Sequence, residues 1–262
     1  MLHPNPTPYA DINELLTQLL ERIQAILGEK LVGLSLFGSL VVGDFDYDIS
    51  DIDLVVATST FINEQEFERL QVMHHDIVAQ YRNWDNRIEI GYIAVKDLKT
   101  TQPYFTIALI SPGEPFHIKE ADADWIIDRY VLHEKGVSLY GPSPQQLVDP
   151  ISKEELLDAV RVQARVWRTW VYSGSTRGFQ AYAILTMCRI YYTLQTGDFV
   201  SKKQAALWTA QALPQWSTLI SNALAWRESW RDEQVDHEAT FPETLRFVHA
   251  ILDLCENESK ED

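Results

Sequence analysis

The stretches that decide the fold are LVGLSLFGS at residues 31–39 and SDIDLVV at residues 50–56. Each apolar run has the length and composition of a buried β-strand. The first run ends at Gly38-Ser39, and the second opens with Asp51 and Asp53. Because side chains alternate along a strand, these two aspartates point to the same face. The sequence therefore predicts a strand that begins with two neighbouring carboxylates.

Paired carboxylates of this kind repel each other unless they share a proton or bind a cation. Proteins hold Mg²⁺ with oxygen ligands, so Asp51 and Asp53 are candidate magnesium ligands. Glu89 is a third candidate, because it stands between two isoleucines in a predicted strand at residues 87–93 and points away from them. Glu89 joins the site if the two strands are neighbours. Otherwise it is an exposed strand carboxylate.

The Gly38-Ser39 pair lies at a predicted strand-to-helix turn, where backbone N–H groups and a hydroxyl are offered to an anion. A Gly-Ser pair by itself has no predictive value. Its value comes from its order in the chain, because eleven residues separate it from Asp51.

Further elements of the first half are also predicted from periodicity. Helical spacing of apolar residues predicts a helix from Asp11 to Leu27, with Asp11 and Glu14 spaced as a capping box and Gly28 at its end. A second helix is expected at about residues 63–81. The first half is therefore mixed α/β.

After Pro150 the sequence changes to helical patterns, and no strand pattern of comparable strength appears. Gly141-Pro142-Ser143-Pro144 is the natural linker. We therefore expect two domains, residues 1–150 and 151–262, and an α+β fold in which a mixed sheet with helices precedes an all-α helical bundle. The expected helices of the second domain span about residues 152–172, 178–196, 201–212, 215–230 and 241–255.

The net charge of −16 divides into −13 for residues 1–150 and −3 for residues 151–262. Proteins that coat nucleic acid or an anionic membrane need basic patches, so we expect neither partner. Between Lys30 and Arg69 the chain is acidic and has no basic residue. That run fits a cation site or a solvated loop and helix face.

Other chemistries have little support in the sequence. Cys188 and Cys255 lie in apolar, helical surroundings, so we expect buried thiols rather than a disulfide. His74 and His75 are adjacent, diverge on a helix and do not form a metal pair. The chain carries no signal-peptide pattern and no apolar run of membrane-spanning length. We therefore expect a cytoplasmic protein.

The order of Gly38-Ser39, the spacer, Asp51-Ile52-Asp53 and a distal acid resembles the nucleotidyltransferase superfamily with the DNA polymerase β-like fold. The resemblance implies that the two aspartates hold Mg²⁺ on the phosphates of ATP. It implies that Gly38 and Ser39 position the triphosphate. Glu89 would be the general base or a further metal ligand.

The second half resembles the helical domain of bacterial aminoglycoside adenylyltransferases of the streptomycin/spectinomycin type. The stretch that carries this resemblance is ILTMCRIYY at residues 184–192, followed by Gly197 and Lys202. The resemblance implies that Arg189 and Lys202 bind the triphosphate. The residues alone favour a surface charge on its helix for each of them, and Lys203 competes with Lys202.

The sequence departs from that family at residues 172–179, YSGSTRGF, which hold no acid and one added base. In the family, acidic and aromatic residues of this loop contact the cationic drug. Acids near residues 44–48 and 114–124 could replace them or be solvated. Six tryptophans follow residue 160, and helical spacing favours packing for most of them, with one or two left to stack on a ligand.

These features favour a Mg²⁺-dependent enzyme that moves AMP from ATP to a hydroxyl of a small, cationic molecule such as an aminoglycoside, releasing pyrophosphate. One alternative keeps the chemistry and changes the acceptor to a protein, as in toxin–antitoxin-linked nucleotidyltransferases. Another is a nucleotide-binding protein without catalysis, which the presence of all three acids disfavours.

Overall fold

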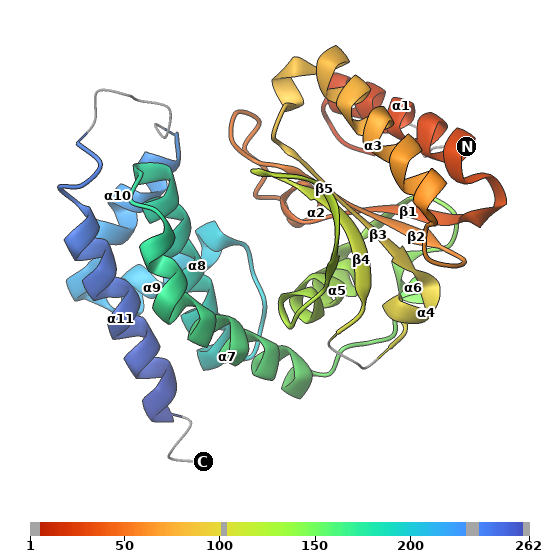
Figure 1. The fold of residues 1–262 in the computed structure, drawn as a ribbon. Helices are drawn as coiled ribbons and strands as arrows, with labels where there is room; N and C mark the ends of the chain where they lie inside the picture. The colour runs from red at the N-terminus through yellow and green to blue at the C-terminus, as the bar shows by residue number, and fades with distance from the viewer. Residues whose placement is uncertain (1–5, 101–103, 229–235, 259–262) are drawn as a thin grey trace. The chain divides into compact units, whose positions relative to one another are not determined.

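The structure is a computed structural model that describes residues 6–100, 104–228 and 236–258. The chain divides into two compact units, Met1–Ile151 and Ser152–Asp262 (Figure 1). The first unit holds a six-stranded sheet with helices, and the described part of the second holds helices and no strand. The α+β fold class expected from the sequence is confirmed.

The sheet of the first unit is mixed. Its strands lie in the order β5-β4-β3-β2-β1-β6, and β2 pairs with β3 in parallel while the other neighbours are antiparallel. The three predicted strands form the centre of the sheet. The strands are β1 (Leu31–Phe37), β2 (Ile52–Thr58), β3 (Ile88–Ala94), β4 (Thr106–Ser111), β5 (Glu114–Glu120) and β6 (Val137–Tyr140).

Three outer strands, β4, β5 and β6, were not predicted. The β4 sequence TIALIS is a short apolar run of the kind that periodicity cannot assign. In β5 only Phe116 is fully buried, and in β6 only Leu139. Strands at a sheet edge bury little apolar surface, so their sequences carry weak patterns.

Two long helices, α1 (Ala10–Leu27) and α3 (Glu64–Gln80), lie side by side on one face of the sheet (Figure 1). Every second residue of the central strands packs against them. Leu36, Leu54 and Ile90 lie in register across β1, β2 and β3 and are at most 1 % exposed. Burying one such side chain contributes about 1.5–3 kcal/mol, so this layer stabilises the register of the sheet.

The prediction of a capping box formed by Asp11 and Glu14 at the start of α1 is wrong. The helix begins earlier than predicted, after Tyr9, which makes no side-chain cap bond. Asn13 Nδ2 donates to the Thr7 carbonyl at 2.8 Å, and the Thr7 N–H donates to Asn13 Oδ1 at 3.0 Å. This exchange takes the place of the proposed Asp11–Glu14 pair, because a capping box requires its first residue at the N-cap.

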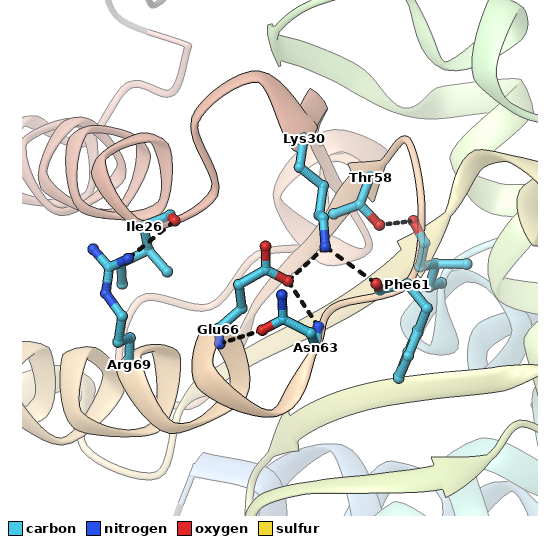
Figure 2. A network of polar contacts seen from close by, with 8 residues as sticks. Ile26, Lys30, Thr58, Phe61, Asn63, Glu66 and Arg69 are labelled. Atoms are coloured by element: carbon cyan, nitrogen blue, oxygen red, sulfur yellow. Dashed lines mark hydrogen bonds and ion pairs between the residues drawn. The ribbon is translucent and has the colours of Figure 1, made fainter.

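A capping box that the sequence did not predict begins α3. The Asn63 side chain accepts the Glu66 N–H at 2.9 Å, and the Glu66 carboxylate accepts the Asn63 N–H at 2.7 Å (Figure 2). Lys30 Nζ lies 2.6 Å from the same carboxylate, and both side chains are largely buried. Glu66, one acid of the charged run between Lys30 and Arg69, therefore stabilises the fold.

The other face of the sheet is covered by α5 (Asp124–Lys135) (Figure 1). Trp125 packs where Gly91 of β3 has no side chain, since a Cβ built there would lie 2.7 Å from the indole. Glycine at position 91 therefore lets the helix approach the sheet. Short helices complete the unit: η1 (Gly28–Lys30), α2 (Ser39–Val42), η2 (Arg82–Trp84), α4 (Val95–Leu98) and α6 (Pro144–Leu147).

The second unit is a helical bundle in which α8 is the most buried helix. Arg168 Nη2 joins α7 to α11 through Asp253 at 3.2 Å and Glu256 at 2.8 Å. The five helices expected in this unit are present. The elements are α7 (Lys153–Trp170), η3 (Val171–Ser173), α8 (Arg177–Thr196), α9 (Lys202–Ala212), η4 (Pro214–Trp216), α10 (Ser217–Glu228) and α11 (Phe241–Glu258).

Aromatic residues and thiols of the bundle serve packing. Trp167 and Trp170 meet edge to face with ring centroids 4.5 Å apart, and Trp226 is buried; Trp230 lies outside the described residues. Cys188 and Cys255 are free and buried, as expected, and burial raises the pKa of Cys188 to about 12. Within the described ranges, no helix has the length and apolar composition needed to cross a bilayer.

A buried histidine makes the stability of the first unit depend on pH. His74 of α3 is 3 % exposed, and its Nε2 lies 2.9 Å from the Tyr92 hydroxyl. Desolvation lowers the pKa of His74 from 6.5 to about 3. Below pH 6.5 the unfolded chain binds a proton that the folded chain does not, so stability falls as the pH drops from about 6.5 toward 3.

We therefore expect the free energy of unfolding to fall by about 2 kcal/mol from His74 alone between pH 7.5 and pH 5, measured by urea denaturation. His74→Gln keeps an acceptor for Tyr92 and cannot titrate, so its pH dependence should be flatter. The exposed neighbour provides the control, because His75→Gln should keep the wild-type slope. Equal slopes in wild type and His74→Gln would contradict the assignment.

Candidate active site

The candidate site lies on the first unit where β1, β2 and β3 meet. Asp53 of β2 is in register with Glu89 of β3 and with Phe37 of β1. Residues in register on neighbouring strands point to the same face, and the strands are about 4.8 Å apart. The condition that brings Glu89 to the aspartates, adjacency of the two strands, is met.

Burial shows on which face the carboxylates lie. Asp51 and Asp53 are half-buried, whereas Ile52 and Leu54 between and after them are fully buried. Leu54 belongs to the face that α1 and α3 cover. The two aspartates and Glu89 therefore lie on the opposite face. Glu89 is two residues before Gly91, the position where Trp125 packs on the sheet.

Gly38 lies directly against the Asp53 carboxylate. A Cβ built on Gly38 would lie 1.8 Å from Asp53 Oδ2, so no other residue fits without moving the carboxylate. The Gly38 backbone, at φ 68° and ψ −149°, is also in a region that residues with a side chain scarcely adopt. The glycine of the Gly-Ser pair is thus required by both the backbone and the aspartate.

The turn after Gly38 leads into α2, which has four residues. The Val41 and Val42 N–H groups donate to the Gly38 carbonyl at 3.2 Å each. A helix of one turn has only a small macrodipole, so what the turn can offer an anion is its first N–H groups and the Ser39 hydroxyl.

The candidate ligands of a magnesium ion are the carboxylates of Asp51 and Asp53. Over the described residues, no group of three or more His, Cys, Asp or Glu side chains forms a metal cage. Mg²⁺ rarely needs such a cage, because one or two carboxylates and the phosphates of a substrate complete its octahedron. Asp51 and Asp53, on one face beside a glycine without a side chain, fit a Mg²⁺ that arrives with a nucleotide.

The cations predicted to bind phosphate lie in the second unit, each against an aromatic ring. The Arg189 guanidinium is 4.7 Å from the centre of the Phe199 ring, and Lys202 Nζ is 4.0 Å from that of Tyr182. Such contacts contribute about 0.5–1 kcal/mol at exposed sites and orient the cation without adding charge. Lys202 is half-buried and Lys203 is exposed, so the two lysines differ in burial.

The loop at residues 172–179 is held by Gln180, a residue that sequence analysis missed. Its side-chain nitrogen donates to the Ser175 and His237 carbonyls at 2.6 Å each. Its oxygen accepts the Thr240 and Thr244 hydroxyls at 2.8 and 2.9 Å. Gln180 is fully buried. The available signal was a polar residue on an apolar helix face.

Several known proteins are similar to this chain. Residues 146–253 match the family described as aminoglycoside adenylyltransferase, C-terminal domain. An aminoglycoside (3'')(9) adenylyltransferase of Escherichia coli is 26 % identical over 92 % of this chain and 94 % of its own length. The chain is therefore similar to aminoglycoside adenylyltransferases along most of its length.

Spectinomycin adenylyltransferases are similar to the chain as well. A spectinomycin 9-adenylyltransferase of Staphylococcus aureus is 24 % identical over 76 % of this chain and 78 % of that protein. The structure of a spectinomycin adenyltransferase AAD(9) from Enterococcus faecialis with ATP and spectinomycin has a TM-score of 0.70 at 18 % identity. It covers 90 % of this chain and 99 % of its own, which shows a shared fold.

We expect Gly38→Ala to abolish Mg²⁺-dependent nucleotide binding, measured by calorimetry with Mg-ATP, because the new methyl group displaces the Asp53 carboxylate. The backbone strain should also cost about 1–3 kcal/mol of stability. Gly43→Ala is the control: Gly43 has φ 79°, and a Cβ there meets nothing within 4 Å. Wild-type binding by Gly38→Ala would refute the role given to this glycine.

Proposed function

We propose that the protein is a Mg²⁺-dependent adenylyltransferase that moves AMP from ATP to a hydroxyl of an aminoglycoside-type antibiotic and releases pyrophosphate. The observation that carries this proposal is the in-register pair of Asp53 and Glu89 beside Gly38, in a chain that is similar to aminoglycoside adenylyltransferases. The acceptor class is supported by the names of the relatives, an aminoglycoside (3'')(9) and a spectinomycin 9-adenylyltransferase.

The proposed reaction is an in-line displacement. Glu89 accepts the proton of the acceptor hydroxyl. At the same time the hydroxyl oxygen forms a bond to the α-phosphorus of ATP. The bond from the α-phosphorus to the bridging oxygen breaks, and pyrophosphate leaves. Asp51 and Asp53 would hold Mg²⁺, which when bound neutralises phosphate charge. Gly38 and Ser39 would position the triphosphate.

The proposal gives Arg189 and Lys202 a role in binding the triphosphate. Their aromatic partners, Phe199 and Tyr182, limit the conformations of the two long side chains, which reduces the entropy lost when phosphate is bound. We propose a cytoplasmic location, where ATP is available and where free, buried Cys188 and Cys255 are stable.

The acceptor is tested with streptomycin and spectinomycin. We expect purified protein to release pyrophosphate from Mg-ATP with at least one of them, together with an adenylylated product detected by mass spectrometry. If neither drug nor any other antibiotic in a panel of hydroxylated compounds led to pyrophosphate release, the proposed acceptor class would be wrong. Transfer of label from ATP to polypeptide in that case would identify a protein acceptor.

Asp53→Asn should lower the turnover rate about 10³-fold, since a lost metal ligand removes several kcal/mol of transition-state stabilisation. Glu89→Gln should lower it about 10²- to 10⁴-fold if Glu89 is the base. Glu68→Gln, an exposed carboxylate of α3, is the control and should stay near wild type. Full activity of Asp53→Asn would exclude the metal role of Asp53.

Lys202→Met should raise the KM for ATP by about ten- to a hundredfold, the loss of one charge-assisted hydrogen bond of about 1.5–3 kcal/mol. Lys203→Met is matched in chemistry and differs in exposure, and its KM should stay within about twofold of wild type. The reverse result, a large effect at position 203 only, would transfer the phosphate role to Lys203.

A further inference from the structure

Strand pairing does not fix Asp51. The ladder between β2 and β3 begins at Ile52, opposite Ile88, so Asp51 lies one residue before the first paired position. The preceding segment, residues 43–50, forms turns and no strand. Contacts outside the sheet must therefore set the position of this carboxylate.

Arg87, which immediately precedes β3, bonds to the chain on both sides of Asp51. Its Nη2 donates to the Ser50 carbonyl at 2.6 Å, and its own carbonyl accepts the Ile52 N–H at 2.9 Å. The same Nη2 donates to the Tyr47 carbonyl at 2.7 Å. One residue therefore holds the turn before Asp51 and the first strand residue after it.

The guanidinium of Arg87 is itself held in place. Its central carbon lies 4.6 Å from the centre of the Trp84 ring, and Trp84 is 2 % exposed. The Tyr47 ring meets Trp84 edge to face at 5.5 Å, and the Tyr47 hydroxyl donates to Asp11 of α1 at 2.5 Å. The turn before Asp51 is thereby fastened to α1 and to the segment that leads into β3.

We propose that Arg87 is a positioning residue that sets Asp51 relative to Glu89. Arg87 and Glu89 are two residues apart on one chain segment, so a shift of Arg87 changes the separation of the two acids. The inference rests on the proposed function, in which Asp51 holds Mg²⁺ and Glu89 takes a proton. It assigns Arg87 no contact with substrate.

Arginine suits this role better than lysine. A planar guanidinium can donate to two carbonyls in its own plane while its face lies on an aromatic ring. A lysine ammonium also has several donors, but it has no plane that could lie on the Trp84 ring, so it would keep the charge with a less fixed geometry. The bonded carbonyls of Tyr47 and Ser50 are three residues apart. Losing the two hydrogen bonds from Arg87 would therefore loosen the turn that leads into Asp51.

The test compares Arg87→Met and Arg87→Lys with Arg69→Met. Arg69 of α3 is a matched control, since it also donates to two backbone carbonyls. These are the carbonyl of Ala25 at 3.2 Å and that of Ile26 at 3.5 Å, the second of which is drawn in Figure 2. The readouts are the Mg²⁺ concentration for half-maximal rate, calorimetric binding of Mg²⁺ with a non-hydrolysable ATP analogue, and the melting temperature of each variant.

We expect Arg87→Met to raise the half-saturating Mg²⁺ concentration and to weaken Mg²⁺-dependent analogue binding by about 10- to 100-fold, as loss of a group that orients metal ligands does. Arg87→Lys, which retains the charge, should be intermediate and folded. Arg69→Met should respond to Mg²⁺ as wild type does.

An unchanged Mg²⁺ response in folded Arg87→Met, or in Arg87→Lys if the methionine variant fails to fold, would overturn the inference. An equal shift in Arg69→Met would also overturn it, because the effect would then come from general loosening. Calorimetry does not require turnover. If wild type fails to adenylylate any antibiotic, the acceptor proposal fails while Arg87 is still tested.

Discussion

Strands β2 and β3 run in parallel, and this pairing sets the geometry of the candidate site. Parallel strands cannot be joined by a tight hairpin, so the chain must cross over, and α3 is the crossover element here. Because both strands run the same way, their first residues lie side by side at the same end of the sheet. Asp53 and Glu89, each the second residue of its strand, therefore become neighbours. In an antiparallel pair of this length they would lie at opposite ends.

That constraint also explains which parts of the structure the sequence could predict. β1, β2 and β3 are buried on both faces, so their sequences are nearly continuous apolar runs that stand out. Their interruptions are informative: Asp53 and Glu89 are polar residues at positions where packing would favour apolar ones. The second unit was predictable for a related reason, since each helix needs an apolar stripe to enter a bundle.

Features built from contacts between distant residues could not be predicted in this way. Arg87 bonds Tyr47 and Ser50, and Gln180 bonds Thr244, yet nothing in the local sequence of either residue announces its partners. The wrong capping box at Asp11 has the opposite cause. A local pattern was present there, but the helix began earlier because Asn13 offered Thr7 a competing pair of hydrogen bonds.

The acidic residues of the first unit have several structural roles rather than one. Glu66 caps α3 and pairs with Lys30, Asp11 accepts from Tyr47, and Asp46 Oδ1 accepts the Asp48 N–H at 3.1 Å in the turn before the site. These acids stabilise the elements that surround Asp51 and Asp53. A high density of like charge raises the cost of bringing two more carboxylates together.

Against this background the position of Arg87 has an electrostatic as well as a geometric consequence. It places a permanent positive charge at the backbone of the acidic turn that leads into Asp51. Because its Nη2 donates to carbonyl oxygens, the guanidinium is held at the main chain of the turn. Backbone anchoring thus stabilises the acidic turn that leads into Asp51.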